Sequence, residues 1–445
     1  MIIPPDNRGD FFDPQTMTYQ ECVEYLFNST PVFEHVGASA YKAGLENTLA
    51  LDDHFDHPHT AYRTIHVAGT NGKGSCSHTL AAILQQAGYR VGLYTSPHLV
   101  DFRERIRVNG RPISEQRVID FVEKERAFFE PLHPSFFELT TALAFLYFKE
   151  QNIDIAVVEV GLGGRLDCTN IIRPELSIIT NISFDHTQFL GNTLAKIAGE
   201  KAGIIKDHTP VVIGEACAET RPVFENKAKE MGAPITFAED QPEVISSTPC
   251  MDANGGRDYA TRHFGSFHGE LGGDYQTKNT NTILCALREL NDPKLTLDVI
   301  QRGFAEVSET TGLMGRWQIV RRHPLVICDT GHNVGGWQYL APQIQRVPCR
   351  QLRMVFGMVD DKDISSVMSL LPQDAVYYWA QATSQRAIPS SKVKMLGIQH
   401  QLHGEDAGSV VNAYQQALAQ ASEDDFIFVG GSSYVVADFL SLKHF

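Results

Sequence analysis

Short apolar runs alternate with longer amphipathic segments along the first 230 residues. The runs have the length and β-branched content of buried strands, and the segments between them have helical periodicity. We expect strands at residues 64–67, 90–94, 153–160, 176–180 and 210–214. We expect helices at residues 75–84, 114–129, 138–151, 193–204, 220–231 and 277–290. This alternation predicts a parallel sheet with helices on both faces.

A second series of strands and helices follows the segment ETTGLMGRW, which indicates a linker at residues 313–317. Its expected strands are 324–328, 353–357, 375–380 and 426–429, and its expected helices are 334–345, 364–371 and 409–421. The chain is therefore predicted to be α/β throughout. We expect an N-terminal P-loop-type domain with a mainly parallel sheet over residues 1–312 and a smaller doubly wound, Rossmann-like domain over 318–445. The polar stretch 239–262 is expected to be a surface excursion without chemistry.

The loop after the first strand, in TIHVAGTNGKGS at residues 64–75, is glycine-rich. Glycines at 69, 72 and 74 let the backbone N–H groups turn toward one point, Lys73 adds a positive charge, and a helix N-terminus follows. The loop is shorter than GxxxxGK[ST], and a glycine separates Lys73 from Ser75. An isolated glycine-rich loop is often only a turn. The strand before it and the helix after it favour a polyphosphate site.

Unusual polar residues follow the next strands, at the sheet edge where ligands gather in α/β folds. Ser96 follows the second strand, Glu159 lies inside an apolar strand, and Asp185 and His186 follow the fourth. An unpaired buried carboxylate is costly. Glu159 therefore either forms a salt bridge with a local arginine such as Arg165 or binds a hard cation. A lone histidine is usually a surface or packed residue. The polar groups at the neighbouring strand ends, however, favour a ligand role for His186.

Lys201 stands in an otherwise apolar helix, in GEKAGIIK. Its stem either packs while its amine reaches solvent, or burial drives the amine neutral. A neutral amine can take up carbon dioxide and become a carbamate, which replaces a positive charge with a negative one.

The second domain places Asp329, His332 and Asn333 directly after a strand, in VICDTGHNVGG, and Arg316 lies in the linker. An arginine from a second domain often neutralises charge on a transferring phosphoryl group. The triplet Asp-Thr-Gly also occurs in aspartic proteases, but that chemistry needs two such carboxylates and no second triplet exists here. The histidines before the phosphate loop match no standard zinc spacing and indicate a solvated loop; they are His54, His57, His59 and His66.

Composition excludes several other classes of protein. The 445 residues carry a net charge of −15, which argues against a nucleic-acid partner. No stretch approaches the ~20 apolar residues of a membrane helix, and the N-terminus lacks the features of a secretory signal. Eight cysteines without a CxxC pair fit a reducing cytoplasm, which is the expected location. A monomer is the default expectation.

Nine sequence blocks occur in the order found in folylpolyglutamate synthases and dihydrofolate synthases of the Mur ligase superfamily. They are HVAGTNGKGS, YTSPHLVDFRERIRVNG, VVEVGLGGRLDCTN, FDHTQFLG, GEKAGIIK, GDYQTKNT, GRW, DTGHNVGG and VFGMVDDKD. The chain resembles this family from about residue 35 to its last strand. The resemblance implies ATP-dependent ligation of L-glutamate to dihydropteroate, to reduced folates, or to both, in folate biosynthesis, with Mg²⁺ as the cofactor.

The resemblance also implies roles for individual residues. Residues implied to hold ATP are Thr70, Asn71, Gly72, Lys73, Gly74, Ser75, Asn279, Arg316 and Asp329. Residues similar to the family's magnesium ligands are Ser96, Glu159 and His186. Lys73, Lys201 and His332 match catalytic positions, with Lys201 as an N6-carboxylysine and His332 at the glutamate end. The segments implied to contact the pterin are Ser135, Phe136, Phe137 and Glu138, and Leu166, Asp167 and Cys168. The family usually has Ala or Ser in place of Cys168.

Three alternatives stay open on the sequence. Besides an enzyme with both activities, the sequence allows an enzyme with folylpolyglutamate synthase activity only, a Mur-type cell-wall peptide ligase, or a regulatory ATPase without a ligase step. Cell-wall ligases usually carry an additional N-terminal domain, and the phosphate loop at residue 69 leaves little room for one. A regulatory ATPase would not require Arg316, Asp329 and His332 from a second domain.

Overall fold

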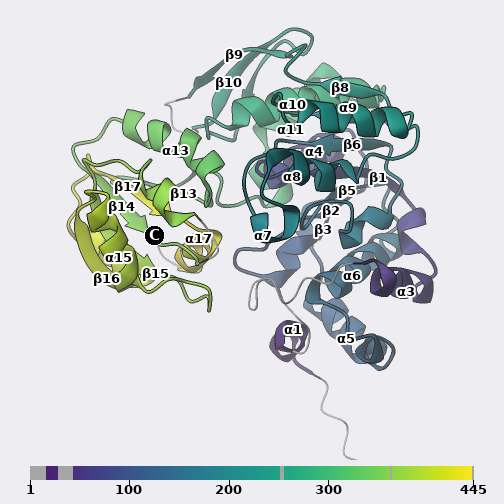
Figure 1. Ribbon diagram of the computed structural model, residues 1–445, viewed down its shortest axis with the longest axis horizontal. Coiled ribbons are helices and arrows are strands. Elements are labelled where there is room, and N and C mark those ends of the chain that lie inside the picture. The colour runs from purple at the N-terminus through teal and green to yellow at the C-terminus, as the bar shows by residue number, and fades with distance from the viewer. Residues whose placement is uncertain (1–16, 29–43, 251–254, 361–362, 443–445) are drawn as a thin grey trace, which may run out of the picture.

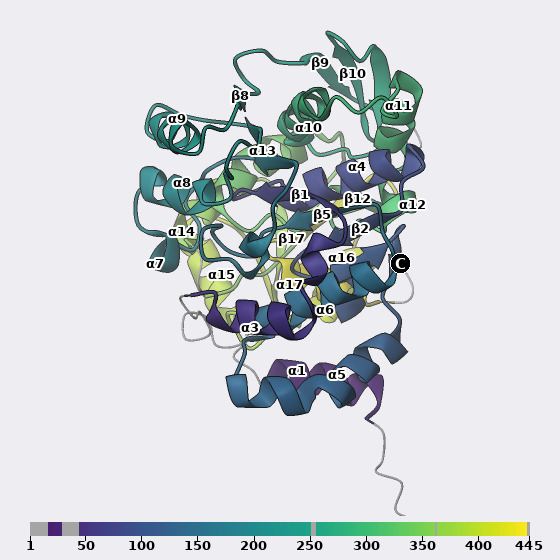
Figure 2. The same ribbon diagram turned by 90° about the vertical axis from the view of Figure 1, so that its right-hand side faces the viewer.

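The computed structural model describes residues 17–28, 44–250, 255–360 and 363–442. These residues form two bodies that lie side by side, one coloured purple to teal and the other light green to yellow in Figure 1. Within the described ranges the strands form sheets of eight, three and six strands. The first two sheets belong to the first body and the third to the second body. In the view turned by 90° the first body lies in front of the second (Figure 2).

The eight-stranded sheet has the order β4-β3-β2-β5-β1-β6-β7-β8. Its strands are β1 (Arg63–Ala68), β2 (Val91–Tyr94), β3 (Ile106–Val108), β4 (Arg111–Pro112), β5 (Ile155–Glu159), β6 (Leu176–Ile179), β7 (Val211–Ile213) and β8 (Ile235–Phe237). From β2 to β8 all neighbours are parallel, and β3 and β4 add an antiparallel edge. The carboxyl ends of the parallel strands therefore meet at one edge, as the alternation of apolar runs and helices predicts.

Helices cover both faces of this sheet, because the central strands are apolar on both sides. One face carries α4 (Lys73–Gln86), α10 (Gln276–Leu290), α11 (Leu297–Ala305) and α12 (Val307–Thr311). The other face carries α5 (Glu115–Phe129), α6 (Phe136–Glu150), α8 (Leu194–Ala202) and α9 (Arg221–Glu230). Shorter or peripheral helices are α1 (Tyr19–Asn28), α3 (Glu46–His54), α7 (Thr187–Leu190), η2 (Pro58–Thr60), η3 (Phe102–Arg105), η4 (Glu130–Leu132) and η5 (Cys168–Ile171). None of the described helices is both long and apolar enough to cross a membrane.

The described part of the polar stretch 239–262, which was expected to be a surface excursion without chemistry, contains regular structure for which no strands were predicted. It contains β9 (Val244–Pro249) and β10 (Arg257–Thr261), which pair antiparallel with each other, and β11 (Ser266–Gly269) pairs with β10. Tyr259 and Phe267 pack from this small sheet into the core beside α11. Only one face of the sheet is buried, so its composition is polar and its strands lack a long apolar run.

The six-stranded sheet has the order β12-β13-β17-β14-β15-β16, and β12 is its antiparallel edge. Its strands are β12 (Gln318–Arg322), β13 (Leu325–Asp329), β14 (Leu352–Phe356), β15 (Val376–Gln381), β16 (Gly404–Ser409) and β17 (Phe426–Gly430). Its helices are α13 (Val334–Arg346), α14 (Ile364–Met368), α15 (Ser390–Gln399), α16 (Val410–Ala419) and α17 (Ser433–Leu440). Buried clusters on both faces confirm the predicted doubly wound pattern. The sequence pattern missed α15, and it missed β16 because this edge strand is polar and mostly exposed.

Candidate active site

The predicted phosphate loop connects β1 to the N-terminus of α4. The helix begins at Lys73, two residues before its predicted start, and Gly72 caps it with φ +85°. Thr180 packs against Gly69 and Asn279 against Gly72 so closely that neither glycine has room for a side chain. Gly69 also has a positive φ of +145°. Glycine is therefore required at both positions for conformational and steric reasons.

Side chains around the loop hold its shape. The Lys73 Nζ donates hydrogen bonds to the carbonyl oxygens of Gly69 (3.1 Å) and Thr70 (3.2 Å). The Thr180 hydroxyl donates to the Asn71 carbonyl at 2.6 Å. On the other side, the Gln276 amide donates to the buried Ser75 hydroxyl at 3.1 Å.

Asn279 takes part in the same network, because its Nδ2 donates to Gln276 Oε1 at 2.9 Å. No sequence pattern had singled out Gln276. Its position three residues before Asn279 on α10 is the signal that points to it, since residues three apart share a helix face.

Glu159 ends β5 as a buried carboxylate beside the loop. It is 3% exposed, and its Oε2 accepts a hydrogen bond from the Ser96 backbone N–H at 3.2 Å. A β-carbon placed on Gly74 would lie 3.8 Å from Glu159 Oε2 and 3.5 Å from Arg316 Nη2, so both groups border the start of α4. Burial raises the pKa of Glu159, while the positive charge of Lys73 opposes that rise. The alternative salt bridge was wrong, because Arg165 pairs with Glu200 at 2.9 Å.

Lys201 lies beneath the phosphate loop. It is 4% exposed, and its Nζ donates to the Gly69 carbonyl at 2.9 Å. The alternative in which its amine reaches solvent is therefore wrong. Burial, and secondarily the charge of Lys73, lowers the pKa of Lys201 to about 7. A large fraction of this amine is therefore neutral near neutral pH.

Asp329 ends β13 and lies where the two bodies meet. Its Oδ2 accepts hydrogen bonds from the Tyr275 hydroxyl of the first body (2.6 Å) and from the Trp317 backbone N–H (2.7 Å). Its Oδ1 accepts from the Gly331 N–H at 2.8 Å. Burial raises the pKa of Asp329, and the hydrogen bond from Tyr275 opposes the rise. Arg316 donates to the Gly315 carbonyl and to the Thr330 hydroxyl.

A reciprocal pair of amides joins the phosphate loop to the second body. Asn71 Nδ2 donates to Asn333 Oδ1 at 3.1 Å, and Asn333 Nδ2 donates to Asn71 Oδ1 at 3.0 Å. Asn333 Nδ2 also donates to Asp185 Oδ2 at 3.1 Å, and His332 Nε2 lies 3.4 Å from the same oxygen. Asn333 and Asp185 were noted in the sequence but not assigned to the site. Their positions directly after strands were the available signal.

A cavity of about 100 Å³ brings several of the predicted residues together. Gly74, Ser96 and Glu159 line it from the first body, Arg316 from the segment that joins the two bodies, and His332 from the second body. His186, the third expected metal ligand, is not among its lining residues. It begins α7 with a positive φ of 49°, and its backbone N–H donates to Asp185 Oδ1 at 2.9 Å.

The segments expected to contact a pterin lie beside the sheet on the α6 face. Ser135 and Glu138 form a capping box at the start of α6, in which the Ser135 N–H donates to Glu138 Oε2 at 2.6 Å. Phe136 is 4% exposed and stacks on Phe27 with ring centroids 4.5 Å apart, whereas Phe137 is only partly buried. Of the two rings, Phe137 is therefore the more accessible.

The second of these segments is shaped by a buried aspartate. The Asp167 carboxylate accepts hydrogen bonds from the backbone N–H groups of Leu162 (2.8 Å) and Thr169 (3.0 Å). Leu166 and Cys168 flank it and are partly buried. Asp167 therefore fixes the backbone of the loop that follows β5.

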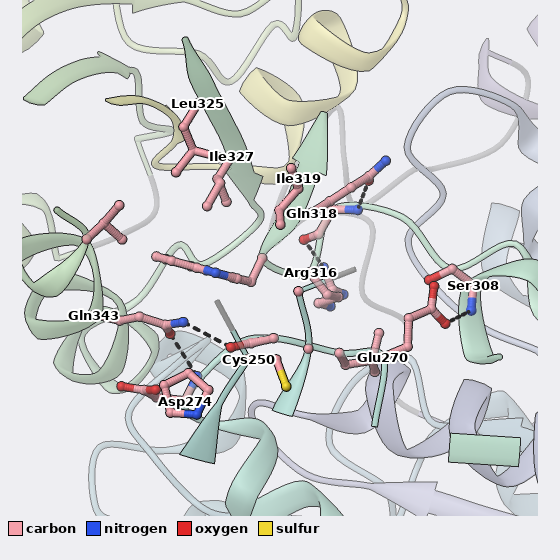
Figure 3. A pocket seen from close by; sticks show the side chains of 18 of the residues that line it. Cys250, Glu270, Asp274, Ser308, Arg316, Gln318, Ile319, Leu325, Ile327 and Gln343 are labelled. Carbon is pink, nitrogen blue, oxygen red and sulfur yellow. Dashed lines mark hydrogen bonds between the residues drawn. The ribbon is translucent and has the colours of Figure 1, made fainter. Parts of the chain in front are cut away.

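A larger cavity of about 610 Å³ lies between the small sheet, α13 and β12 (Figure 3). Figure 3 shows Gln343 at its wall, where the Nε2 donates to the Gly272 carbonyl at 3.0 Å and the Oε1 accepts from the Asp274 N–H at 2.7 Å. Arg316 lines this cavity as well as the smaller one. The walls of this cavity come from segments far apart in the chain, so no local sequence pattern predicts it.

The phosphate loop, the buried Glu159 carboxylate, and Arg316 and His332 at the same small cavity together form the site of an ATP-dependent ligase of the Mur type. The chain matches the Mur ligase middle domain over residues 67–280 and the Mur ligase glutamate ligase domain over residues 315–433. It is 32% identical to dihydrofolate synthase/folylpolyglutamate synthase of Bacillus subtilis, over 89% of this chain and 94% of the relative. The chain belongs to the dihydrofolate synthase/folylpolyglutamate synthase family, which confirms the resemblance inferred from its sequence blocks.

Other comparisons agree with this assignment. A probable bifunctional folylpolyglutamate synthase/dihydropteroate synthase of Haloferax volcanii is 32% identical over 95% of this chain, and the chain spans only half of that relative's length (50%). The E. coli FolC structure in complex with DHPP and ADP has a TM-score of 0.80 at 30% identity, covering 95% of this chain and 97% of FolC. A bifunctional synthase structure with Mn, AMPPNP and L-glutamate bound has a TM-score of 0.79 at 29% identity, covering 96% and 98%.

Proposed function

We propose that this chain ligates L-glutamate to a pterin-bearing carboxylate at the expense of ATP, and that it accepts both dihydropteroate and reduced folates. The observation that carries the proposal is the junction of the phosphate loop with the second body. There Glu159, Ser96 and Gly74 share one small cavity with Arg316 and His332. Structural neighbours bind ADP with DHPP, and AMPPNP with Mn and L-glutamate, which supports the substrate classes.

In this proposal, the loop residues hold the ATP phosphates. Three more distant residues contact the base, the γ-phosphate and the ribose. The loop residues are Thr70, Asn71, Gly72, Lys73, Gly74 and Ser75. Asn279 contacts the base side, Arg316 the γ-phosphate and Asp329 the ribose side. The free N–H groups at the start of α4 and the charge of Lys73 favour an anion at this place.

The donor set beside the loop fits a divalent cation. Glu159 offers a buried carboxylate oxygen and Ser96 a hydroxyl in the small cavity, and Mg²⁺ prefers oxygen ligands together with phosphates and water. We include the imidazole nitrogen of His186 in the set, although this residue does not line that cavity. We assign Mg²⁺ to this set, since structures of relatives contain Mn with an ATP analogue. A bound Mg²⁺ supplies Lewis-acid stabilisation of negative charge on the phosphoryl oxygens.

The reaction proceeds through an acyl phosphate, because a free carboxylate is a poor acyl donor. The pterin-acid carboxylate oxygen attacks the γ-phosphorus and ADP leaves. The neutral amine of glutamate then attacks the acyl carbon, phosphate leaves with the C–O bond electrons, and the amine loses a proton. Lys73 and Arg316 spread the charge of the transferring phosphoryl group. Contact between the two bodies excludes water, which would otherwise hydrolyse the acyl phosphate.

Two further residues act on charge and orientation in this proposal. The neutral Lys201 amine attacks carbon dioxide and loses a proton to give a carbamate, which places a negative charge beneath the phosphate loop. His332 lies at the glutamate end, where its Nδ1 is 3.0 Å from the Thr330 carbonyl oxygen and is thereby oriented.

The pterin lies against Ser135–Glu138 and Leu166–Cys168, with the partly exposed ring of Phe137 offering a flat face.

Incorporation of radiolabelled glutamate with each acceptor tests the proposal. We expect glutamate-dependent ADP release and labelled product with dihydropteroate and with tetrahydrofolate. Labelling with tetrahydrofolate alone would reduce the activity to polyglutamylation. ATP turnover without product, or activity only on a uridine-linked peptide, would overturn the proposal. We further propose that the protein is cytoplasmic and monomeric. Light scattering coupled to size-exclusion chromatography tests the oligomeric state.

A further inference from the structure

The outer face of the small sheet carries a cysteine, an aspartate and a histidine at one end. Asp258 on β10 stands directly opposite His268 on β11 in the antiparallel register. Cys250 follows β9, and its backbone N–H donates to the Gly256 carbonyl at 2.9 Å, which brings it beside the start of β10. The opposite face of this sheet is packed into the core through Tyr259 and Phe267. The three side chains are therefore held on a supported scaffold.

The ligand atoms of these side chains converge on one point. Cys250 Sγ lies 3.0 Å from Asp258 Oδ2 and 3.7 Å from His268 Nδ1, and His268 Nδ1 lies 3.0 Å from Asp258 Oδ1. In a tetrahedral zinc site, bond lengths of about 2.3 Å to sulfur and about 2.0–2.2 Å to nitrogen and oxygen place neighbouring ligand atoms about 3.4–3.6 Å apart. The Cys250 and His268 contacts go to different oxygens of Asp258, and one ligand atom from each of the three residues lies within 4.8 Å of the others, so side-chain rotations would bring them to these separations.

We propose that Cys250, Asp258 and His268 bind a zinc ion outside the nucleotide site. The mixed sulfur, nitrogen and oxygen donor set selects Zn²⁺ over Mg²⁺, which prefers oxygen ligands alone. Three protein ligands leave the fourth tetrahedral position to water. Binding forms the S–Zn bond and releases the thiol proton to solvent, while His268 coordinates through Nδ1 with its proton on Nε2.

Local charges suit a cation at this place. The Asp258 carboxylate supplies a negative charge, and the Cys250 thiol supplies a second one when it gives up its proton on binding the ion. Asp258 is exposed, and Cys250 and His268 are partly exposed, which gives the ion a path from solvent. Without zinc, the same three groups form only a hydrogen-bonded cluster. The experiment distinguishes this cluster from a zinc site.

The position of the site suggests a structural effect of the ion. Cys250 lines the cavity of about 610 Å³ between the two bodies (Figure 3). Gly255, at the same end of the hairpin, lies so close to Ile319 of β12 that an added β-carbon would be 2.9 Å from Ile319 Cδ1. An ion that ties β9, β10 and β11 together would therefore stiffen the part of the first body that contacts the second.

Cobalt substitution of the full-length protein tests the proposal directly. The protein is stripped with a chelator, kept reduced with a phosphine, and titrated with Co²⁺ while its near-ultraviolet thiolate-to-cobalt band is recorded. We expect one equivalent of Co²⁺ to produce the band and Zn²⁺ to abolish it by displacement. Cys250→Ser should lose the band, and His268→Ala and Asp258→Asn should weaken Zn²⁺ binding by about tenfold or more.

Controls separate this site from the nucleotide site. Cys349→Ser removes an exposed cysteine that is not part of the cluster and should leave the band unchanged. Ligase activity at saturating Mg²⁺ should be the same for Cys250→Ser and the parent chain, and Zn²⁺ should raise the melting temperature of the parent chain only. Absence of the band in the parent chain, or its persistence in folded Cys250→Ser, would overturn the proposal even if the ligase function is correct.

Discussion

Replacement of Lys201 tests the link between burial, amine chemistry and carbamate formation. With a pKa of about 7, about 90% of the amine is neutral at pH 8, whereas an amine at the ordinary value of 10.5 is only about 0.3% neutral. The buried lysine therefore offers about 300 times more of the reactive form. We expect ¹³C-bicarbonate to give one carbamate carbon resonance in the parent chain at pH 8 and none in Lys201→Met.

Lys196 on the same helix provides the matched control, because it is exposed. Lys196→Met should retain the carbamate resonance and the ligase activity, whereas Lys201→Met should lose both without unfolding. A parent spectrum without the resonance between pH 7 and pH 9, or an unchanged resonance in Lys201→Met, would refute the reasoning.

The same pKa shift makes folding depend on pH. The folded pKa of Lys201 lies below its unfolded value of 10.5, so the unfolded chain binds more protons between about pH 7 and pH 10.5. The free energy of unfolding should therefore rise with pH in this window, by at most about 1.4 kcal/mol per pH unit from this group. Calorimetry under argon should show the melting temperature of the parent chain rising relative to Lys201→Met from pH 7.5 to pH 9.5. Parallel curves would contradict this.

Four further substitutions probe the site and its surroundings. Glu159→Gln keeps the side-chain volume but removes the charge, so ADP release should fall by about 10²-fold or more. The melting temperature should stay the same or rise, because burial disfavours the charged form of Glu159. Full activity would contradict the metal assignment. Asn333→Asp removes the donor to Asn71 and places a second carboxylate beside Asp185, and calorimetric titration should show ATP binding weakened by about 1–3 kcal/mol. Phe137→Ala should raise the KM for dihydropteroate by about 2–10-fold with little change for ATP, whereas Phe136→Ala should cost about 3–5 kcal/mol of stability; equal effects of the two on KM would argue against the pterin face.

Sequence patterns alone determined the α/β class and the location of the phosphate loop. These features depend on local signals: apolar runs of strand length, helical periodicity between them, and glycines that must turn the chain after β1. The strand-end positions of Glu159 and Asp329 were also predictable, because parallel strands bring their carboxyl ends to one edge. The small sheet of β9, β10 and β11 escaped prediction because a sheet with one buried face has no continuous apolar run.

Only the tertiary structure decided which polar residues meet and in which protonation state. The Asn71 and Asn333 amides pair across 262 positions of sequence, and Lys201 reaches the Gly69 carbonyl across 132. Packing between distant segments decides whether the Lys201 amine is buried or solvated. It also decides whether Glu159 forms a salt bridge with Arg165 or lies beside the phosphate loop. The pKa of a group follows from its burial and its neighbouring charges, and a linear pattern specifies neither.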